Sequence, residues 1–524
     1  MSLTRRELLA ATGSLGAGAA LAVPGWAREP RRLLREGRFA HVASGLPGPH
    51  STVLWTRVDG LERSGRVAVE IARDSGFRKV VERRVVKLSP ADDFTVHARI
   101  ASRRLKPGTE YFYRFESDAD RSSVGRFRTR RPPDSREPVR VGFFSCQAWQ
   151  SGYYNAHAAL AAEPDLDLVV GLGDYIYEAS SDTGPREDTI GPDRSAQTLD
   201  EYRRKYRLYQ SDPNLRAMHA AHPFVAIWDD HEVESSYYRD SGGNLQGRER
   251  RVPLLQRRAN GYRAFFEHLP ILRTRSERDR IYRTIPLGAN ADVVLTDLHQ
   301  YADPSPCPDA KTAGPVLLEP CEEAKAPGRS LLGASQREWL KSVFAGSRAT
   351  WKLWGSSMML MALDSAPGQP YTLGEWSGWE AERAEIARFL VDRGIGNVAA
   401  FSGDIHTFFA GRWTTTGRSD GRTAGVEFVS GSITTHGIAE GIAAASGTPL
   451  TPDQAAAIAS NVRATNPHIV YDDVVHHGYA VATASADELR VDFRAARSTT
   501  EQGAGVFTLA RFRVPRGRGE VQVV

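Results

Sequence analysis

Four apolar runs along this chain each end in a short segment of side chains that can ligate metal ions. The runs have the length and composition of buried strands and span residues 139–144, 166–172, 224–228 and 398–402. The candidate ligands follow them closely and are Cys146, Asp174, Tyr177, Asp229, Asp230, His231, Asp404 and His406. Thiolate, carboxylate, phenolate and imidazole groups all bind metals, so this order predicts one metal centre assembled from distant loops.

Helical patterns separate these strands. Further apolar runs at 293–297 and 351–355 are also expected to be strands. The patterns that predict helices span residues 200–209, 254–267, 335–345 and 380–393, and a polar segment with glycine and proline at 181–197 predicts a surface loop. Alternating strands and helices are typical of an α/β domain, which we place at residues 136–524.

The region before this domain follows another pattern. Short runs of alternating apolar and polar residues, with turn residues between them, occur at 52–58, 66–71, 94–98 and 105–115. They predict a β-sandwich domain over residues 38–130 with a structural role, and the last run resembles the strand of fibronectin type III domains that carries their corner tyrosine. Two domains also suit a length of 524 residues.

Charge and composition exclude one class of partner. The net charge is only +5, with 25% charged and 41% hydrophobic residues, as in soluble globular proteins. The sequence has no long basic block with interleaved aromatic residues, so we expect no nucleic-acid binding.

Residues 1–27 have the composition of an export signal. Arg5 and Arg6 precede an apolar stretch rich in alanine and glycine, and the small residues Gly25 and Ala27 suit a cleavage site. The segment resembles a twin-arginine signal, which implies transport of the folded protein by the twin-arginine translocon to the bacterial periplasm or the exterior. An ordinary secretory signal with a chance arginine pair is the alternative. No other apolar run is long enough for a transmembrane anchor.

Export also bears on the three cysteines, because thiols oxidise outside the cytoplasm. Cys307 and Cys321 flank a segment with proline and glycine, and a disulfide between them would contribute roughly 3 kcal/mol by closing a short loop. Cys146 is then left over. A cysteine of this kind can be a buried apolar residue, a reactive thiol or a thiolate ligand, and its neighbours favour the ligand.

Together these motifs resemble the PhoD-type alkaline phosphatases, relatives of the purple acid phosphatases in the calcineurin-like metallophosphoesterase group. Besides the candidate ligand loops, the matching segments are 42–45, 54–58, 332–336 and 466–469. The resemblance covers nearly the whole chain after the leader. It implies a two-sheet αββα sandwich preceded by a fibronectin- or immunoglobulin-like β-sandwich.

The resemblance also implies a set of metal ligands. Fe³⁺ would be held by Cys146, Asp174, Tyr177 and His406. One or more Ca²⁺ ions would be held by Asp174, Asp229, Asp230 and Asp404. The wider superfamily has an Asn-His pair at the position of Asp230 and His231, where the first residue binds metal and the second contacts the leaving group. Both residues are therefore expected to be catalytic.

The chain departs from this family pattern in three places. Ser235 and Ser236 stand where relatives usually have two asparagines, which predicts weaker Ca²⁺ binding because amide carbonyls are better calcium ligands than hydroxyls. His477 stands where relatives often have arginine, and we expect it to bind substrate in an altered phosphate clamp. The third departure is at residues 376–379, where this chain has Trp-Ser-Gly-Trp and relatives tend to have Trp-Asp-Gly-Tyr.

These observations predict an exported metal-dependent phosphoesterase. It would hydrolyse small-molecule or lipid phosphate esters, as monoesters, diesters or both, through a metal-activated hydroxide or oxide. A phospholipase D-type phosphodiesterase is one alternative. A non-catalytic protein that binds metal or phosphate is the other, and Ser235, Ser236 and His477 would be its marks.

Overall fold

The computed structural model describes residues 32–180, 184–188, 194–243, 245, 248–273, 279–313 and 316–524. The predicted export signal at residues 1–27 lies outside the described residues. Within them, no helix is both long and apolar enough to cross a membrane.

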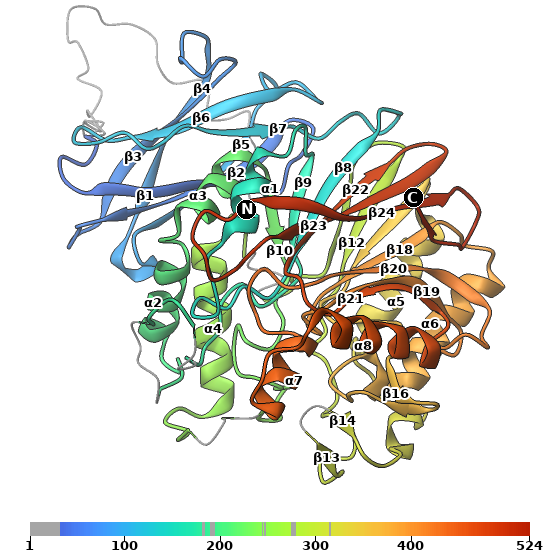
Figure 1. Cartoon of the computed structure of the whole chain (residues 1–524). Coiled ribbons are helices and arrows are strands. Elements are labelled where there is room, and N and C mark those ends of the chain that lie inside the picture. The colour runs from blue at the N-terminus through green and yellow to red at the C-terminus, as the bar shows by residue number, and fades with distance from the viewer. Residues whose placement is uncertain are drawn as a thin grey trace, which may run out of the picture.

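Two antiparallel sheets form the N-terminal part of the chain (Figure 1). One contains β1 (Arg38–Gly45), β2 (Ser51–Asp59) and β5 (Thr95–Ala101), and the other β3 (Gly65–Ala72), β4 (Val80–Leu88), β6 (Glu110–Glu116) and β7 (Gly125–Arg128). Apolar side chains of both sheets, such as Leu54 and Val69, share one core. The Tyr111 hydroxyl accepts a hydrogen bond from the Lys106 amide at 2.8 Å, as a corner tyrosine does.

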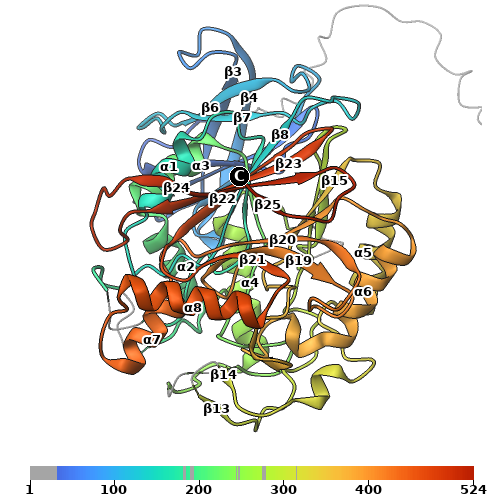
Figure 2. The same cartoon turned by 45° about the vertical axis from the view of Figure 1, so that its right-hand side comes forward.

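Two seven-stranded sheets pack face to face in the rest of the chain (Figures 1 and 2). The first has the order β10-β9-β8-β22-β23-β24-β25, with β8 (Val139–Phe144), β9 (Leu168–Gly171), β10 (Phe224–Ala226), β22 (Gly478–Ala484), β23 (Glu488–Ala496), β24 (Val506–Pro515) and β25 (Gln522–Val523). The second has the order β11-β12-β15-β18-β20-β19-β21, with β11 (Arg283–Pro286), β12 (Ala291–Leu295), β15 (Trp351–Gly355), β18 (Val398–Ser402), β19 (Phe408–Thr414), β20 (Thr423–Ser430) and β21 (Ile469–Asp473). Phe143 of the first sheet stacks on Phe401 of the second, with ring centroids 4.0 Å apart.

Helices cover the outer faces of these sheets. Alternate residues of β18 show the layering, because Phe401 points into the core between the sheets, whereas Ala400 shares a second core with helices α5 (Gly333–Gly346) and α6 (Glu380–Asp392). On the first sheet, Leu160 of α1 (Asn155–Ala162) lies against Gly142. The helices α2 (Leu199–Tyr209), α3 (Pro213–Ala221) and α4 (Leu254–His268) follow along the chain. The predicted αββα sandwich is confirmed.

The predicted elements are present with small shifts at their ends. The predicted strands at 139–144, 351–355 and 398–402 agree at both ends with β8, β15 and β18, and the four predicted helices are α2, α4, α5 and α6. The surface loop predicted at 181–197 is wrong for its last three residues, which are buried. The reason is Gln197, whose side chain donates to the Glu249 carbonyl and accepts from the Arg251 amide.

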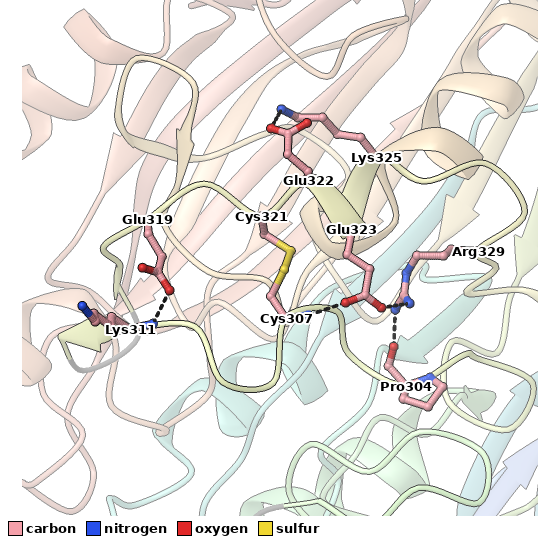
Figure 3. The surroundings of a disulfide bond; sticks show 9 residues. All are labelled: Pro304, Cys307, Lys311, Glu319, Cys321, Glu322, Glu323, Lys325 and Arg329. Carbon is pink, nitrogen blue, oxygen red and sulfur yellow. Dashed lines mark hydrogen bonds and ion pairs between the residues drawn. A yellow bond between two sulfur atoms is a disulfide. The ribbon is translucent and has the colours of Figure 1, made fainter.

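The cysteines have the predicted arrangement. Cys307 and Cys321 form a disulfide with their Cα atoms 6.1 Å apart (Figure 3). The loop around it is tied further by Glu323, which accepts hydrogen bonds from the Cys307 amide and from Arg329. Cys146 is free and buried.

Candidate metal centre

The candidate ligands lie just beyond the carboxyl ends of parallel strands. β8, β9 and β10 are parallel neighbours, and their ends lead to Cys146, Asp174 and Asp229. β12, β15 and β18 are parallel neighbours in the facing sheet, and β18 leads to Asp404 and His406. Open α/β sheets place their ligand sites at this kind of edge.

Left-handed backbone at four positions turns these loops sharply toward one point. Cys146, Asp174, Asp404 and His406 have φ values of 56°, 52°, 60° and 55°. Such conformations are unfavourable for residues with a Cβ atom and cluster at functional sites. Gly173 has φ 116°, and a Cβ atom there would lie 2.5 Å from the Cβ atom of Asp229, so only glycine lets the two loops approach this closely.

Three groups of candidate ligand atoms form, each with its atoms within 4.8 Å of one another. The groups are Cys146 with Asp174 and His406, Asp174 with Asp230 and His231, and Asp174 with Asp229 and Asp404. Asp174 belongs to all three, so its carboxylate stands at the centre of the cluster. Donors in such number and proximity suit more than one cation.

Tyr177 joins the cluster without the helix that its spacing from Asp174 suggested. Residues 174–177 form a loop and not the start of a helix. The loop turns so that the Tyr177 hydroxyl donates to Asp174 Oδ2 at 2.7 Å and lies 3.3 Å from His406 Nε2. Each of the eight residues proposed from the strand ends is therefore in this cluster or in contact with it.

The electrostatics of the cluster require positive charge. Burial raises the pKa values of Cys146, Asp174 and Tyr177, and nearby carboxylates raise them further. Burial, followed by Asp229 and Asp230, raises the pKa of Asp404 to about 8. Oδ1 of Asp230 is buried and has no hydrogen-bond partner among the described residues. Bound cations would stabilise the charged forms of these buried groups, so the donor set fits metal ions.

His406 is held in the form that a metal needs. Its Nδ1 donates to the His436 carbonyl at 2.8 Å, so Nε2 keeps its lone pair and points toward Tyr177. Burial lowers the pKa of His406 to about 4, so the ring is neutral near pH 7.

Glu232 and Glu178 form hydrogen bonds with the residues of the cluster and position them. The sequence analysis assigned no role to either residue. The Glu232 carboxylate accepts hydrogen bonds from the amides of Asp174 at 3.2 Å, Tyr175 at 2.5 Å and Asp229 at 2.7 Å. Glu178 lies 2.6 Å from His231 Nδ1 and orients that ring. Although burial opposes it, Asp230 and Glu178 raise the pKa of His231 well above its usual value.

The sequence analysis also did not name His299 and Glu375 as candidate site residues. His299 Nε2 lies 2.7 Å from Asp229 Oδ1, and this contact raises the pKa of His299 to about 9 although burial opposes the shift. His299 follows the predicted strand 293–297 by two residues, so the strand-end signal that found the other ligands was available. Glu375 lies beside Asp404, and burial together with Asp404 raises its pKa. No apolar run precedes Glu375, so it gave no such signal.

Two residues that depart from the family pattern lie outside the ligand cluster. Ser235 and Ser236 act through their backbone amides, which donate to Glu178 at 3.0 Å and to Asp230 Oδ2 at 2.6 Å. Any residue can supply these bonds. The ring nitrogens of His477 lie 2.8 Å from Ser432 Oγ and 2.9 Å from Glu440 Oε1, so substrate binding by His477 stays a prediction.

A helix–sheet–sheet–helix sandwich with this acid-rich centre at its strand ends defines a metal-dependent phosphoesterase. A family model described as PhoD-like phosphatase matches residues 141–493, and the model of that family's N-terminal domain matches residues 25–131. The chain belongs to the PhoD-like phosphatase family and is, by that membership, a hydrolase of phosphoric esters.

Individual relatives agree with this assignment. Alkaline phosphatase D of Bacillus subtilis (strain 168) is 32% identical over 494 residues, which cover 90% of this chain and 79% of that protein. The solved structure of PhoD has a TM-score of 0.80 at 29% identity, covering 93% of this chain and 91% of that one. Purple acid phosphatase PPD1 from yellow lupin seeds shares the fold, with a TM-score of 0.54 at 12% identity over 89% of this chain and 73% of that one.

Proposed function

We propose that this chain is an exported phosphoesterase whose centre binds Fe³⁺ and one or more Ca²⁺ ions. The observation that carries the proposal is the position of Asp174, whose carboxylate belongs to three groups of ligand atoms at once. Asp174 would therefore be a ligand to more than one cation. When bound, the ions would supply Lewis-acid stabilisation of charge on the phosphoryl oxygens.

The donor types divide the residues between the two metals. Fe³⁺ suits the set with thiolate, phenolate and imidazole donors, which are Cys146, Asp174, Tyr177 and His406. Ca²⁺ suits the set with only carboxylate donors, which are Asp174, Asp229, Asp230 and Asp404.

His231 is the proposed proton donor to the leaving oxygen. Its Nδ1 is paired with Glu178, so Nε2 faces Asp230 and the ligand cluster. Although burial opposes the shift, Asp230 and Glu178 raise the pKa of this ring. Asp230 is oriented by the Ser236 amide, and its Oδ1, which has no hydrogen-bond partner among the described residues, lies 3.9 Å from His231 Nε2. A protonated imidazole at this place neutralises charge on an alkoxide as it leaves.

We extend the proposal to the layout of the chain. Residues 1–27 would be a twin-arginine signal, residues 38–130 a structural β-sandwich domain and residues 136–524 the catalytic domain. The disulfide between Cys307 and Cys321 supports an oxidising destination, the periplasm or the exterior.

Turnover of p-nitrophenyl phosphate and bis-p-nitrophenyl phosphate, each with and without Ca²⁺, tests the activity. We expect hydrolysis that EGTA lowers and Ca²⁺ restores, with the iron content unchanged throughout. A protein that retains its metals and turns over neither ester would be the non-catalytic alternative.

Tyr177→Phe tests the ferric site. We expect the purified protein to be coloured, because phenolate or thiolate bound to Fe³⁺ absorbs visible light. The variant should shift or lose this band, because its hydroxyl lies within 3.3 Å of Asp174 and His406 and is the donor removed. Tyr153→Phe, a partly exposed tyrosine outside the cluster, is the control. An active, colourless enzyme that contains only zinc would contradict the assignment.

A further inference from the structure

A cavity of about 630 Å³ opens directly beside the metal centre. Asp404, His406 and Glu375 form its polar end. The remaining walls are mainly apolar and are formed by Val316, Tyr371, Thr372, Ile405, His436, Gly437, Ile438, Gly441, Ile442 and Ala445. This volume lies within the usual range of small-molecule sites.

Helix α7 (Ile438–Ser446) turns an apolar stripe toward this cavity, and only its first residue, Ile438, also packs against a core of the described residues. Ile438, Gly441, Ile442 and Ala445 have the spacing of one helix face. Ala439 is the only fully buried residue of α7, and Ile442 is 37% exposed. An apolar helix face left open to water beside a reaction centre is a binding surface.

Both walls of the cavity are held in place. On one side, the Glu440 carboxylate accepts from the Gly437 amide and pairs with His477, each at 2.9 Å, which anchors the start of α7. On the other side, the Tyr371 carbonyl accepts from the Leu317 amide at 3.2 Å. Leu317 shares a small core with Cys321, so the disulfide loop supports this wall. The strands β13 (Thr312–Ala313) and β14 (Val316–Leu317) and helix α7 lie at the same end of the molecule in Figures 1 and 2.

We propose that this cavity binds the apolar group of the phosphate ester while the phosphate lies at Asp404 and His406. The inference rests on the proposed esterase activity and specifies its substrate class as esters that carry an alkyl or aryl group. Among the residues that the structure describes, no lysine or arginine lines the cavity, and its acids are Glu375 and Asp404. A second anionic group would therefore be unfavourable there, whereas an apolar group gains the free energy of leaving water.

Ester series that change only the apolar group test the proposal on the full-length holoenzyme. One series is methyl, butyl and octyl p-nitrophenyl phosphodiester, and the other is methyl-, butyl- and octylphenyl phosphate. Each series keeps its leaving-group chemistry constant, and all concentrations stay below micelle formation. We expect kcat/KM to rise by roughly threefold to fourfold for each methylene that becomes buried.

Ile442→Asn should flatten this rise, and Ile442→Leu should keep it. Val470→Asn is the matched control, because Val470 is also 37% exposed but lies outside the cavity. If kcat/KM keeps rising up to the octyl member, the group that the cavity binds is an extended alkyl chain. If the rise in kcat/KM ends at the butyl member, the group is a compact aryl or short alkyl group. Equal kcat/KM across a series whose methyl member is hydrolysed would overturn the inference, as would an unchanged slope in Ile442→Asn. Loss of turnover for every member would instead contradict the esterase function itself.

Discussion

Asp174→Asn is expected to lower kcat/KM for p-nitrophenyl phosphate by at least about a hundredfold. A loss of about a hundredfold is the largest that is usual when a residue that only hydrogen-bonds to a metal ligand is removed, and Asp174 is itself a proposed ligand. The effect should exceed that of any other single ligand, because Asp174 belongs to all three groups of ligand atoms. The amide keeps the shape of the side chain and removes its charge. Metal analysis of the purified variant should therefore show loss of both metals.

Two further variants are compared with Asp174→Asn. Asp404→Asn leaves the group of Cys146, Asp174 and His406 complete, so it should keep iron and lose only calcium-dependent activity. Asp200→Asn changes a carboxylate on α2 that is 72% exposed and should behave like the unchanged protein. If Asp174→Asn retained both metals and its turnover, the shared-carboxylate arrangement would be wrong.

Glu232→Ala is expected to cost at least about 3 kcal/mol of folding free energy, because it leaves three backbone amides without their acceptor at about 1–3 kcal/mol each. These amides belong to Asp174, Tyr175 and Asp229, so this one carboxylate binds both loops. The measurement is the denaturant midpoint of the metal-loaded protein, compared with Glu338→Ala, a mostly exposed glutamate.

The metal content of Glu232→Ala should fall together with its stability. Glu232→Gln supplies a similar shape with only one acceptor oxygen, so its stability should lie between the alanine variant and the unchanged protein. An alanine variant with an unchanged midpoint would show that water or neighbouring groups satisfy these amides and that Glu232 does not organise the loops.

The order of elements and the identity of the candidate ligands could be predicted from local patterns. The apolar run at 398–402 is followed by Gly403, Asp404 and His406, and these features need no knowledge of the partner strands. The α/β class followed from the same patterns, since strands alternate with helices, whereas the two-sheet sandwich was implied by the family resemblance. The free state of Cys146 followed from an odd number of cysteines and from its neighbours.

Only the tertiary structure decided how these residues divide into groups. Asp404 and His406 are two residues apart, yet one approaches Asp229 and the other Cys146, because left-handed backbone at both positions sends their side chains to different groups. His299 follows strand β12 of the facing sheet, and its contact with Asp229 exists only because the two sheets pack together. The sequence analysis assigned no role to residues 438–446, whereas the fold places the apolar face of α7 in the cavity beside Asp404 and His406. Sequence patterns report local periodicity, and contacts between segments far apart in the chain depend on packing that no single segment encodes.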